Sequence, residues 1–389
     1  MPQTGSFKKV LIAHQSTIPH YRIPFYNALE QARPAAWCFE VVFDPVELSA
    51  PKFFLEPLDA QQFHFPTMPV RSYSARIAQK TISYQTFWRT SARYDLIIVE
   101  QALNNLTYPL CQLHQLHRTK FAFWGHGKDR SIARPSAAKL ISEKLKLFLT
   151  RFSDGFFAYT PGVKHYLVSQ GISPAKIFTV NNTIDILDQR RVYAKWLPQR
   201  EEQRELFNLQ GKKVLLFVGR FTKNKRVDFL LQAFCKLRAI DRDFHLLLVG
   251  SEGDRFLQKY QDLSNITYFG PVVDLDKLAP IYVASDVFAF PGSVGLGPLQ
   301  ALCYDLPILT IDSPIHMPEI EYLSKENSIL LGSNASPAAY ATEIKDLFDH
   351  TERLNDLRST VWPSIRYLTI EQMAQNFITG INMIFDRTT

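Results

Sequence analysis

Short apolar runs alternate with segments of helical periodicity along the whole chain. The runs that predict strands are KVLIAHQ, CFEVVF, YDLIIVE, KFAFWG, GFFAY and KIFTV in the first half, and KVLLFVG, FHLLLVG, ITYFG, DVFAFPG and LPILTI in the second. Strands that alternate with helices in this way indicate parallel sheets covered by helices. The pattern therefore predicts an α/β protein with two series of strands.

The segment 186–212 separates the two series, because it is polar, helix-prone and without a strand pattern. A chain of 389 residues also exceeds the size at which one hydrophobic core stops growing. We therefore predict a first domain in residues 1–185, a linker in 186–212 and a second domain in 213–365. Ligands of such sheets bind beyond the carboxyl ends of the strands, so we expect the functional site there.

The composition is that of a soluble globular protein, with 46% hydrophobic and 21% charged residues. No apolar run reaches the roughly 18 residues that span a bilayer, and the start MPQTGSFKKVLIAHQ lacks the plan of a signal peptide. The four cysteines stand apart in apolar surroundings, which predicts reduced thiols rather than disulfides or a metal site. We expect a cytoplasmic protein.

The net charge of +7 is unevenly distributed, because residues 1–185 hold 21 Lys and Arg against 12 Asp and Glu. Residues 71–93 hold five cations and no acid, and residues 128–151 hold seven cations around the apolar stripe of LISEKLKLFL. Such a surface suits an anionic membrane face or a phosphate-bearing partner, and an ordinary solvated basic face has the same composition. Nucleic acid is not expected as a partner, since no known binding motif occurs.

One strand-to-helix joint is unusually basic, FVGRFTKNKRVDFLLQAF at residues 217–234. The strand ends at Gly219, and Val227 begins an i, i+3, i+4, i+7 apolar spacing that predicts a helix. A helix N-terminus disfavours each positive charge by about 0.3–1 kcal/mol, yet the joint holds Arg220, Lys223, Lys225 and Arg226. A bound anion such as a diphosphate would make Arg220 and Lys225 favourable there; a solvated basic turn is the alternative.

The order of motifs after this joint resembles glycosyltransferase family 4, a retaining family with the GT-B fold. A Gly-Arg followed by Lys, at 219–225, precedes LLLVGSEGD (246–254), ITYFGPVVDLDKLAPIYVASDVFAFPG (266–292), GLGPLQALCYDLPILT (295–310) and HMPEIEYLSKENSILL (316–331). The resemblance covers residues 213–350 in order. It implies two Rossmann-like domains that face each other across a cleft, with a C-terminal helix in 366–389 that crosses back to the first domain.

The resemblance also implies how a donor is bound. Gly219, Arg220 and Lys225 would grip the diphosphate of the donor. The glycine-rich turn PGSVGLG would bring the main chain of three residues close to phosphate or sugar oxygens: Gly295, Leu296 and Gly297. Glu319 is the remaining carboxylate expected near the donor, and a cap or an ion pair at a helix start is the alternative.

The Glu-x7-Glu signature of the family is not retained. Alignment of LQALCYDLP places Gly292 at the first Glu and Gln300 at the second. Gln300 can still accept hydrogen bonds from ribose hydroxyls, without charge assistance, whereas Gly292 cannot contact the donor sugar. The run PGSVGL also resembles a subset of polysaccharide-building members. An active enzyme and a binding-only relative are both compatible with these changes.

The first half resembles the family more loosely. His126, in FWGHGKDRS (123–131), stands between two glycines at a strand end, and the resemblance implies a contact to the donor sugar. A hydrogen bond within the loop is the alternative. IPHYRIPFYNAL (18–29) resembles the turn and helix beneath the acceptor site, so His20, Tyr21 and Arg22 would face the acceptor. Packing of the Tyr and solvent exposure of the Arg account for them equally well.

The function implied is transfer of a sugar, with retention, from a nucleotide-diphosphate-sugar donor to a saccharide or lipid-linked acceptor in cell-surface polysaccharide synthesis. The protein would lie on the inner face of the cell membrane, with Arg220, Lys225 and His126 as catalytic residues. No cofactor or metal is expected, because Asp274 and Asp276 fit a helix cap better than a metal site. The alternatives are a non-catalytic nucleotide- or saccharide-binding relative, and an epimerase or phosphorylase on the same fold.

Overall fold

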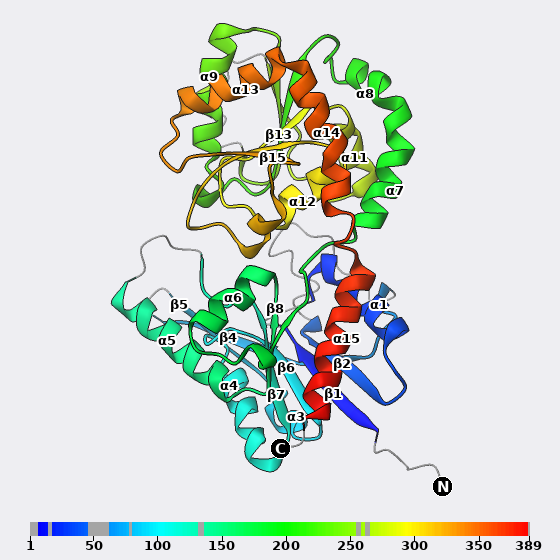
Figure 1. Cartoon of the computed structure of the whole chain (residues 1–389), viewed down its shortest axis with the longest axis vertical. Helices are drawn as coiled ribbons and strands as arrows, with labels where there is room; N and C mark the ends of the chain where they lie inside the picture. The colour runs from blue at the N-terminus through cyan, green and yellow to red at the C-terminus, as the bar shows by residue number, and fades with distance from the viewer. Residues whose placement is uncertain are drawn as a thin grey trace. The chain divides into compact units, whose positions relative to one another are not determined.

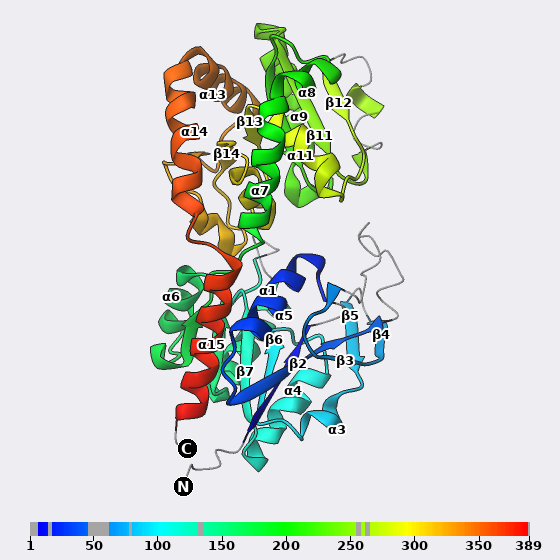
Figure 2. The same cartoon turned by 90° about the vertical axis from the view of Figure 1, so that its right-hand side faces the viewer.

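The computed structural model describes residues 7–14, 18–45, 62–77, 80–130, 136–253, 258–260 and 265–387. The chain divides into two compact units. Unit 1 contains Met1–Asp129, Arg134–Ile184 and Ile370–Thr389, and unit 2 contains Arg130–Ala133 and Asp185–Thr369. Figures 1 and 2 show the elements of both units in two views. Each unit is built on a parallel sheet of its own, as the alternating pattern predicted.

The described strands of the unit 1 sheet run in the order β3-β2-β1-β6-β7-β8-β9, and every neighbouring pair is parallel. The central strands are continuous apolar runs, as expected when helices cover both faces of a sheet. The strands are β1 (Lys8–Ala13), β2 (Trp37–Phe43), β3 (Thr67–Pro69), β6 (Leu96–Glu100), β7 (Lys120–Gly125), β8 (Gly155–Ala158) and β9 (Ile177–Thr179).

The helices of unit 1 are η1 (His20–Arg22), α1 (Ile23–Ala32), α3 (Trp88–Ser91), α4 (Thr107–Gln112), η3 (Leu113–His117), α5 (Ala137–Phe152), α6 (Pro161–Ser169), η4 (Pro174–Lys176) and α15 (Ile370–Asp386). An antiparallel hairpin, β4 (Ser72–Ile77) and β5 (Lys80–Gln85), forms a separate small sheet. The hairpin lies in the basic stretch 71–93, for which the apolar pattern predicted no strands.

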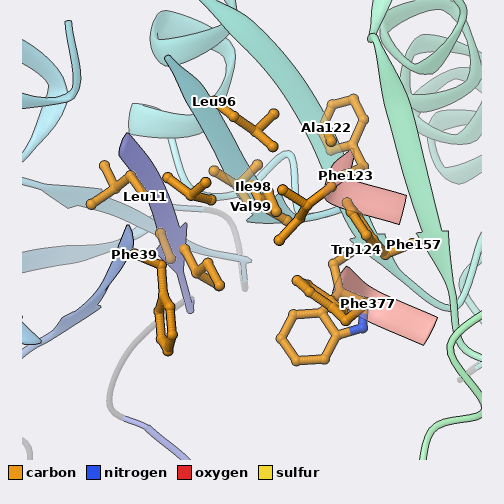
Figure 3. Packing of buried hydrophobic residues seen from close by; sticks show 14 of the residues in the cluster. Leu11, Phe39, Leu96, Ile98, Val99, Ala122, Phe123, Trp124, Phe157 and Phe377 are labelled. Atoms are coloured by element: carbon orange, nitrogen blue, oxygen red, sulfur yellow. The ribbon is translucent and has the colours of Figure 1, made fainter. Parts of the chain in front are cut away.

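The C-terminal helix α15 belongs to unit 1, as predicted. It packs along α1, and its residues Met373, Phe377 and Ile381 are fully buried. The Phe377 ring lies between Trp124 of β7 and Phe157 of β8, with ring centroids 5.1 and 4.2 Å away (Figure 3). The end of the chain therefore completes the core that its first strands begin.

The described strands of the unit 2 sheet run in the order β12-β11-β10-β13-β14-β15, all parallel. They are β10 (Lys213–Val218), β11 (Phe244–Val249), β12 (Ile266–Tyr268), β13 (Val287–Ala289), β14 (Ile308–Ile311) and β15 (Ser328–Leu331). The helices are α7 (Ile186–Trp196), η5 (Leu197–Gln199), α8 (Arg200–Leu206), η6 (Lys223–Lys225), α9 (Val227–Ile240), η7 (Gln258–Tyr260), α11 (Leu275–Val283), α12 (Leu296–Leu302), η8 (Pro318–Tyr322), α13 (Pro337–Asp349) and α14 (Thr351–Ile365). The predicted helix after the basic joint is α9.

Residues 186–212 are part of unit 2 rather than a linker, which corrects our prediction. Their helices α7 and α8 pack against α11. Arg200 Nη2 donates to Asp286 Oδ1 at 2.7 Å, and Arg204 Nη1 lies 3.4 Å from Asp286 Oδ2. The polar composition that suggested a linker thus includes cations paired with a carboxylate 86 residues away from Arg200.

Candidate functional site

The strand order in the sheet of unit 2 reverses between β10 and β13, which lie side by side at the middle of the sheet. From β10 the chain proceeds outward to β11 and β12, whereas β13, on the other side of β10, leads to β14 and β15. In an open α/β sheet, ligands bind at this switch point, beyond the carboxyl ends of the two strands. Gly219 and Arg220 directly follow β10, and the turn 290–295 follows β13. Two predicted motifs that are far apart in sequence therefore meet at the switch point.

Lys225 is held against the turn that follows β13. Its Nζ donates to the Ser293 carbonyl oxygen at 2.6 Å and lies 4.9 Å from the centroid of the Phe290 ring. Burial, with a smaller contribution from nearby Arg220, lowers the pKa of Lys225 from 10.5 to about 8, against the opposing effect of Glu319. The fold therefore keeps two cations near each other, and one of them, Lys225, is half-buried. A bound anion would stabilise that arrangement.

The turn after β13 is fixed to two other loops of unit 2 through Ser293. The Ser293 N–H donates to the Asn224 carbonyl oxygen at 2.8 Å. The Ser293 hydroxyl donates to the Ile315 carbonyl oxygen at 2.7 Å. Because Asn224 directly precedes Lys225, these bonds set the position of the basic joint relative to the glycine-rich turn.

His316 supports the same turn, and our sequence analysis did not identify it. Its Nδ1 accepts from the Val294 N–H at 3.0 Å, and its Nε2 donates to the Ile311 carbonyl oxygen at 2.9 Å. Burial lowers the pKa of His316, which keeps the imidazole in the neutral form that this bonding requires. In the sequence, His316 begins the HMPEIE motif, and this position could have drawn attention to it. Its hydrogen-bond partners lie in the turn after β13 and at the end of β14, so they could be identified only from the structure.

Gly292, at the position of the first Glu in the signature, packs directly on Lys225. A Cβ built on Gly292 would lie 2.3 Å from the carbonyl carbon of Lys225 and 2.4 Å from its Cα and its carbonyl oxygen. Since these are backbone atoms, no side-chain rotation could relieve the overlap. The main chain that carries Lys225 thus occupies the space that a side chain at this position would need.

The start of α12 completes the switch-point crevice. Gly295 is the N-cap of this helix, and Leu296 and Gly297 form its first turn. A Cβ built on Gly297 would have the Val218 carbonyl oxygen, the last of β10, as its nearest neighbour at 3.9 Å. The backbone N–H groups of a first turn have no acceptor within their own helix. An oxygen of a ligand can therefore approach the main chain here.

Gln300 lies one turn further along α12 and is half-buried. Its Nε2 donates to Gln189 Oε1 at 3.1 Å, and the Tyr304 hydroxyl donates to the same oxygen at 3.3 Å. The bond to Gln189 orients the amide of Gln300, whose Oε1 can act as a hydrogen-bond acceptor.

Glu319 lies in the first turn of η8 and is buried. Its negative charge raises the pKa of Lys225 against the larger effect of burial. Glu319 is therefore an acid at a helix start that also acts on the basic pair, and its place near a donor stays a prediction.

Arg22 is buried in unit 1, which corrects the prediction that it faces an acceptor. It is 1% exposed, and its guanidinium lies 4.7 Å from the centroid of the Trp124 ring. Arg22 donates to Asn182 Oδ1, and its Nη1 lies 3.7 Å from Met373 Sδ. Arg22 therefore joins η1 to the segment after β9 and to α15. His20 and Tyr21, from the same turn, are exposed.

His126 directly follows β7 and is half-buried. Its ring contacts the Tyr159 ring edge-on, with centroids 4.4 Å apart. The next residue, Gly127, has φ +73°, and a Cβ there would lie 3.0 Å from Val163 Cγ1. The tight turn therefore requires glycine at 127. A contact between His126 and a donor sugar stays a prediction.

A buried network that sequence reasoning missed lies at the switch point of unit 1, between β1 and β6. His14 Nδ1 donates to Glu100 Oε1 at 2.8 Å, and His14 Nε2 accepts from the Tyr26 hydroxyl at 2.5 Å. His14 is buried, and burial raises the pKa of Tyr26 well above its usual value. Because both ring nitrogens are occupied, the network braces the carboxyl edge of the sheet.

Among the described residues, no group of three or more His, Cys, Asp or Glu side chains is arranged to hold a metal ion. Asp274 caps α11 by accepting from the Asp276 N–H at 2.9 Å, and Asp276 Oδ1 pairs with Lys195 at 2.6 Å. Across the part of the chain that the structure describes, no helix is both long enough and apolar enough to cross a membrane.

Comparison with known sequences identifies a family match within unit 2 and a relative of part of the chain. Residues 212–350 match the family model described as Glycosyl transferases group 1. The chain is 29% identical over 199 residues to Spore coat protein SA of Bacillus subtilis (strain 168), a match that covers 46% of this chain and 51% of that protein. The chain thus spans about half the length of this curated relative.

Comparison with solved structures establishes the fold. Anabaena Alr3699/HepE in complex with UDP is similar with a TM-score of 0.70 and 13% identity, over 96% of this chain and 99% of that chain. Sucrose-phosphate synthase from Thermosynechococcus elongatus is similar with a TM-score of 0.66 and 17% identity, over 97% and 99%. The chain therefore has the GT-B fold with two Rossmann-like parallel sheets, as predicted.

Proposed function

We propose that the protein is a glycosyltransferase that binds a nucleotide-diphosphate-sugar donor at the switch point of unit 2. The observation that carries this proposal is the position of half-buried Lys225 beside Arg220 at the switch point, with its ammonium held on the Ser293 carbonyl oxygen and its pKa lowered to about 8. A diphosphate supplies the negative charge that both cations favour. The match of residues 212–350 to group 1 glycosyl transferases and the UDP complex of Alr3699/HepE support the same class of donor.

In this proposal, each residue of the site contacts a different part of the donor or supports a residue that does. Arg220 and Lys225 neutralise the charge that builds on the departing diphosphate, where preorganised cations have their largest effect. Gln300 Oε1 accepts a hydrogen bond from a ribose hydroxyl, and Glu319 holds Lys225 in place. The remaining donor contacts come from main-chain N–H groups of Gly295, Leu296 and Gly297. Gly219, whose own N–H donates to the Val249 carbonyl oxygen at 2.9 Å, leads the chain from β10 into the basic joint.

The transfer proceeds with retention and without a protein nucleophile in this proposal. An oxygen of the donor phosphate helps to deprotonate the acceptor hydroxyl on the same face of the sugar, so the protein contributes positioning and charge stabilisation. His126 contacts the donor sugar, and His20 and Tyr21 lie on the acceptor side. No metal takes part, because the two cations perform the neutralisation.

The acceptor we propose is a saccharide or lipid-linked saccharide of a cell-surface polysaccharide, extended on the cytoplasmic side of the membrane. Three observations support this choice. The turn PGSVGL resembles that of polysaccharide-building transferases, and the curated relative is a spore coat protein. The basic excess of residues 1–185 suits an acceptor presented on an anionic surface.

Calorimetric titration with UDP, GDP, dTDP and ADP tests the donor site. We expect one of the four to bind selectively, and to raise the free energy of unfolding by about 2.7 kcal/mol when present at about 100 times its dissociation constant. Binding of none of them would contradict the proposal. Binding without any transfer to glycan acceptors would favour a non-catalytic relative. Turnover without an acceptor, or dependence on free phosphate, would favour an epimerase or a phosphorylase, since the fold cannot separate these classes.

We expect the affinity for the selected nucleoside diphosphate to fall above about pH 8. The bound diphosphate favours charged Lys225 and raises its pKa from about 8, so binding above that pH takes up a proton. The dissociation constant should change little between about pH 7 and pH 8, and then rise by up to about tenfold per pH unit. Titrations at a series of pH values measure this directly.

The matched control for the pH experiment is Lys225→Arg, because a guanidinium stays charged over the whole range. Its affinity is expected to be weaker than that of the native protein but nearly independent of pH up to about pH 9.5. A native profile that is flat across the same range would show that Lys225 does not bind the diphosphate.

A further inference from the structure

Helix α5 presents an apolar face to solvent rather than to the core. Five large apolar side chains on this helix are between 49% and 67% exposed: Leu140, Ile141, Leu145, Phe148 and Phe152. At 3.6 residues per turn, they fall within about 140° of the helix circumference. The Phe148 and Phe152 rings contact each other edge-on, with centroids 4.8 Å apart. A contiguous apolar stripe of this kind on a surface helix marks an interaction site.

The charged side chains of α5 are also unevenly distributed between the exposed face and the rest of the helix. Lys144 and Arg151 lie on the exposed face among the apolar residues. Lys144 is four residues after Leu140 and four before Phe148, so it lies between them along the helix surface. Glu143, the one acid in this fully described helix, points away from that face. It is half-buried and its Oε1 pairs with Lys146 at 2.7 Å. The exposed face therefore holds cations and apolar groups only.

The short helix η3 extends this surface at the C-terminal end of α5. Gln115 Nε2 donates to the Phe152 carbonyl oxygen at 3.0 Å, which places η3 beside the last turn of α5. Leu116 is 81% exposed and Leu113 is 55% exposed, and Arg118 directly after η3 is exposed as well. Figure 1 shows α5 along the outside of unit 1, with α4 beside it.

We infer that the exposed face of α5, together with the tip of η3, docks onto an anionic lipid bilayer. A helix with aromatic and aliphatic residues on one side and cations beside them lies in the headgroup region with its apolar side in the acyl boundary. Pairing with a second copy would bring Lys144 and Arg151 of both chains together, which like-charge repulsion disfavours. An anionic headgroup layer instead complements them. This inference deepens the membrane location in the proposed function, and its evidence, the exposed face of α5, does not depend on donor binding.

Co-sedimentation of the full-length protein with vesicles tests the inference. Vesicles of phosphatidylglycerol and phosphatidylethanolamine are expected to bind the protein, and vesicles of phosphatidylcholine alone to bind it at least tenfold more weakly. The variant Ile141→Ser/Phe148→Ser/Phe152→Ser should lose at least tenfold in partitioning to anionic vesicles. The variant Lys144→Gln/Arg151→Gln should lose on the order of 25-fold, about fivefold for each charge.

The control variant is Leu206→Ser, which removes an equally exposed leucine from α8 of unit 2 and should leave vesicle binding unchanged. Thermal unfolding and nucleotide titration of every variant separate loss of lipid binding from loss of the fold or of the donor site. Equal binding to neutral and anionic vesicles, no binding to either, or retention by the triple serine variant would overturn the inference. So would a dimer in sedimentation velocity that the triple variant converts to a monomer without any lipid.

Discussion

Replacing Gly292 with glutamate is expected to damage the site rather than restore the missing carboxylate. The new Cβ would lie 2.3 Å from the Lys225 carbonyl carbon, so the basic joint would have to move as a unit. Overpacking against backbone lowers the free energy of unfolding by about 1–3 kcal/mol. Lys225 Nζ would also leave the Ser293 carbonyl oxygen, and we expect the affinity for the nucleoside diphosphate to fall by at least about tenfold, or about 1.4 kcal/mol.

Two alanine variants separate the steric cause from the chemical one. Gly292→Ala carries the same Cβ without a carboxylate and should reproduce most of the loss in stability, measured by denaturant unfolding. Gly297→Ala, whose Cβ has 3.9 Å to its nearest neighbour, should leave the fold intact or stabilise α12 by up to about 1 kcal/mol. A Gly292→Glu protein with native stability and native nucleotide affinity would contradict the packing argument.

The departure from the family signature therefore has a physical reason that the sequence alone could not supply. From the sequence alone, glycine at position 292 meant only that the contact between the first Glu of the signature and the donor sugar is lost. In the structure, Lys225 approaches that glycine because Ser293 and His316 hold the turn against the basic joint. The contact joins residues far apart in the chain, and residue spacing carries no information about such distances.

Periodicity predicted the elements well, because each depends on local pattern. The apolar spacing from Val227 became α9, and the short apolar runs became the two parallel sheets. The pattern did not predict strands β3, β4, β5 and β15, and the other failures involve polar residues with distant partners. Arg22 was predicted to face an acceptor, but Asn182 and Met373, 160 and 351 residues away, surround it in the core. Residues 186–212 were predicted to be a linker because they are polar. Their cations Arg200 and Arg204 pair with Asp286, and that partner could not be identified from the sequence.

Arg220→Ala is expected to reduce turnover more than removal of any carboxylate in the chain. Arg220 is exposed, so its loss should change the free energy of unfolding by less than about 0.5 kcal/mol. In the proposed reaction it neutralises the departing diphosphate, and loss of one such group lowers kcat by about 10²–10³-fold. Glu319→Gln should cost less, since Glu319 acts on the diphosphate only through Lys225.

The comparison that decides this prediction is Lys223→Ala, which removes an exposed cation from the same basic joint. If net charge alone draws the donor, Lys223→Ala and Arg220→Ala will raise the dissociation constant for the nucleoside diphosphate equally and leave kcat unchanged. If Arg220 stabilises the leaving group, only its variant will lose kcat, and Arg220→Lys will recover part of it, because an ammonium keeps the charge but not the planar fork of donors. Single-turnover rates with saturating donor separate the two cases, because they report the chemical step apart from binding. Near-native single-turnover rates in Arg220→Ala would remove Arg220 from the mechanism and leave the leaving-group charge to Lys225.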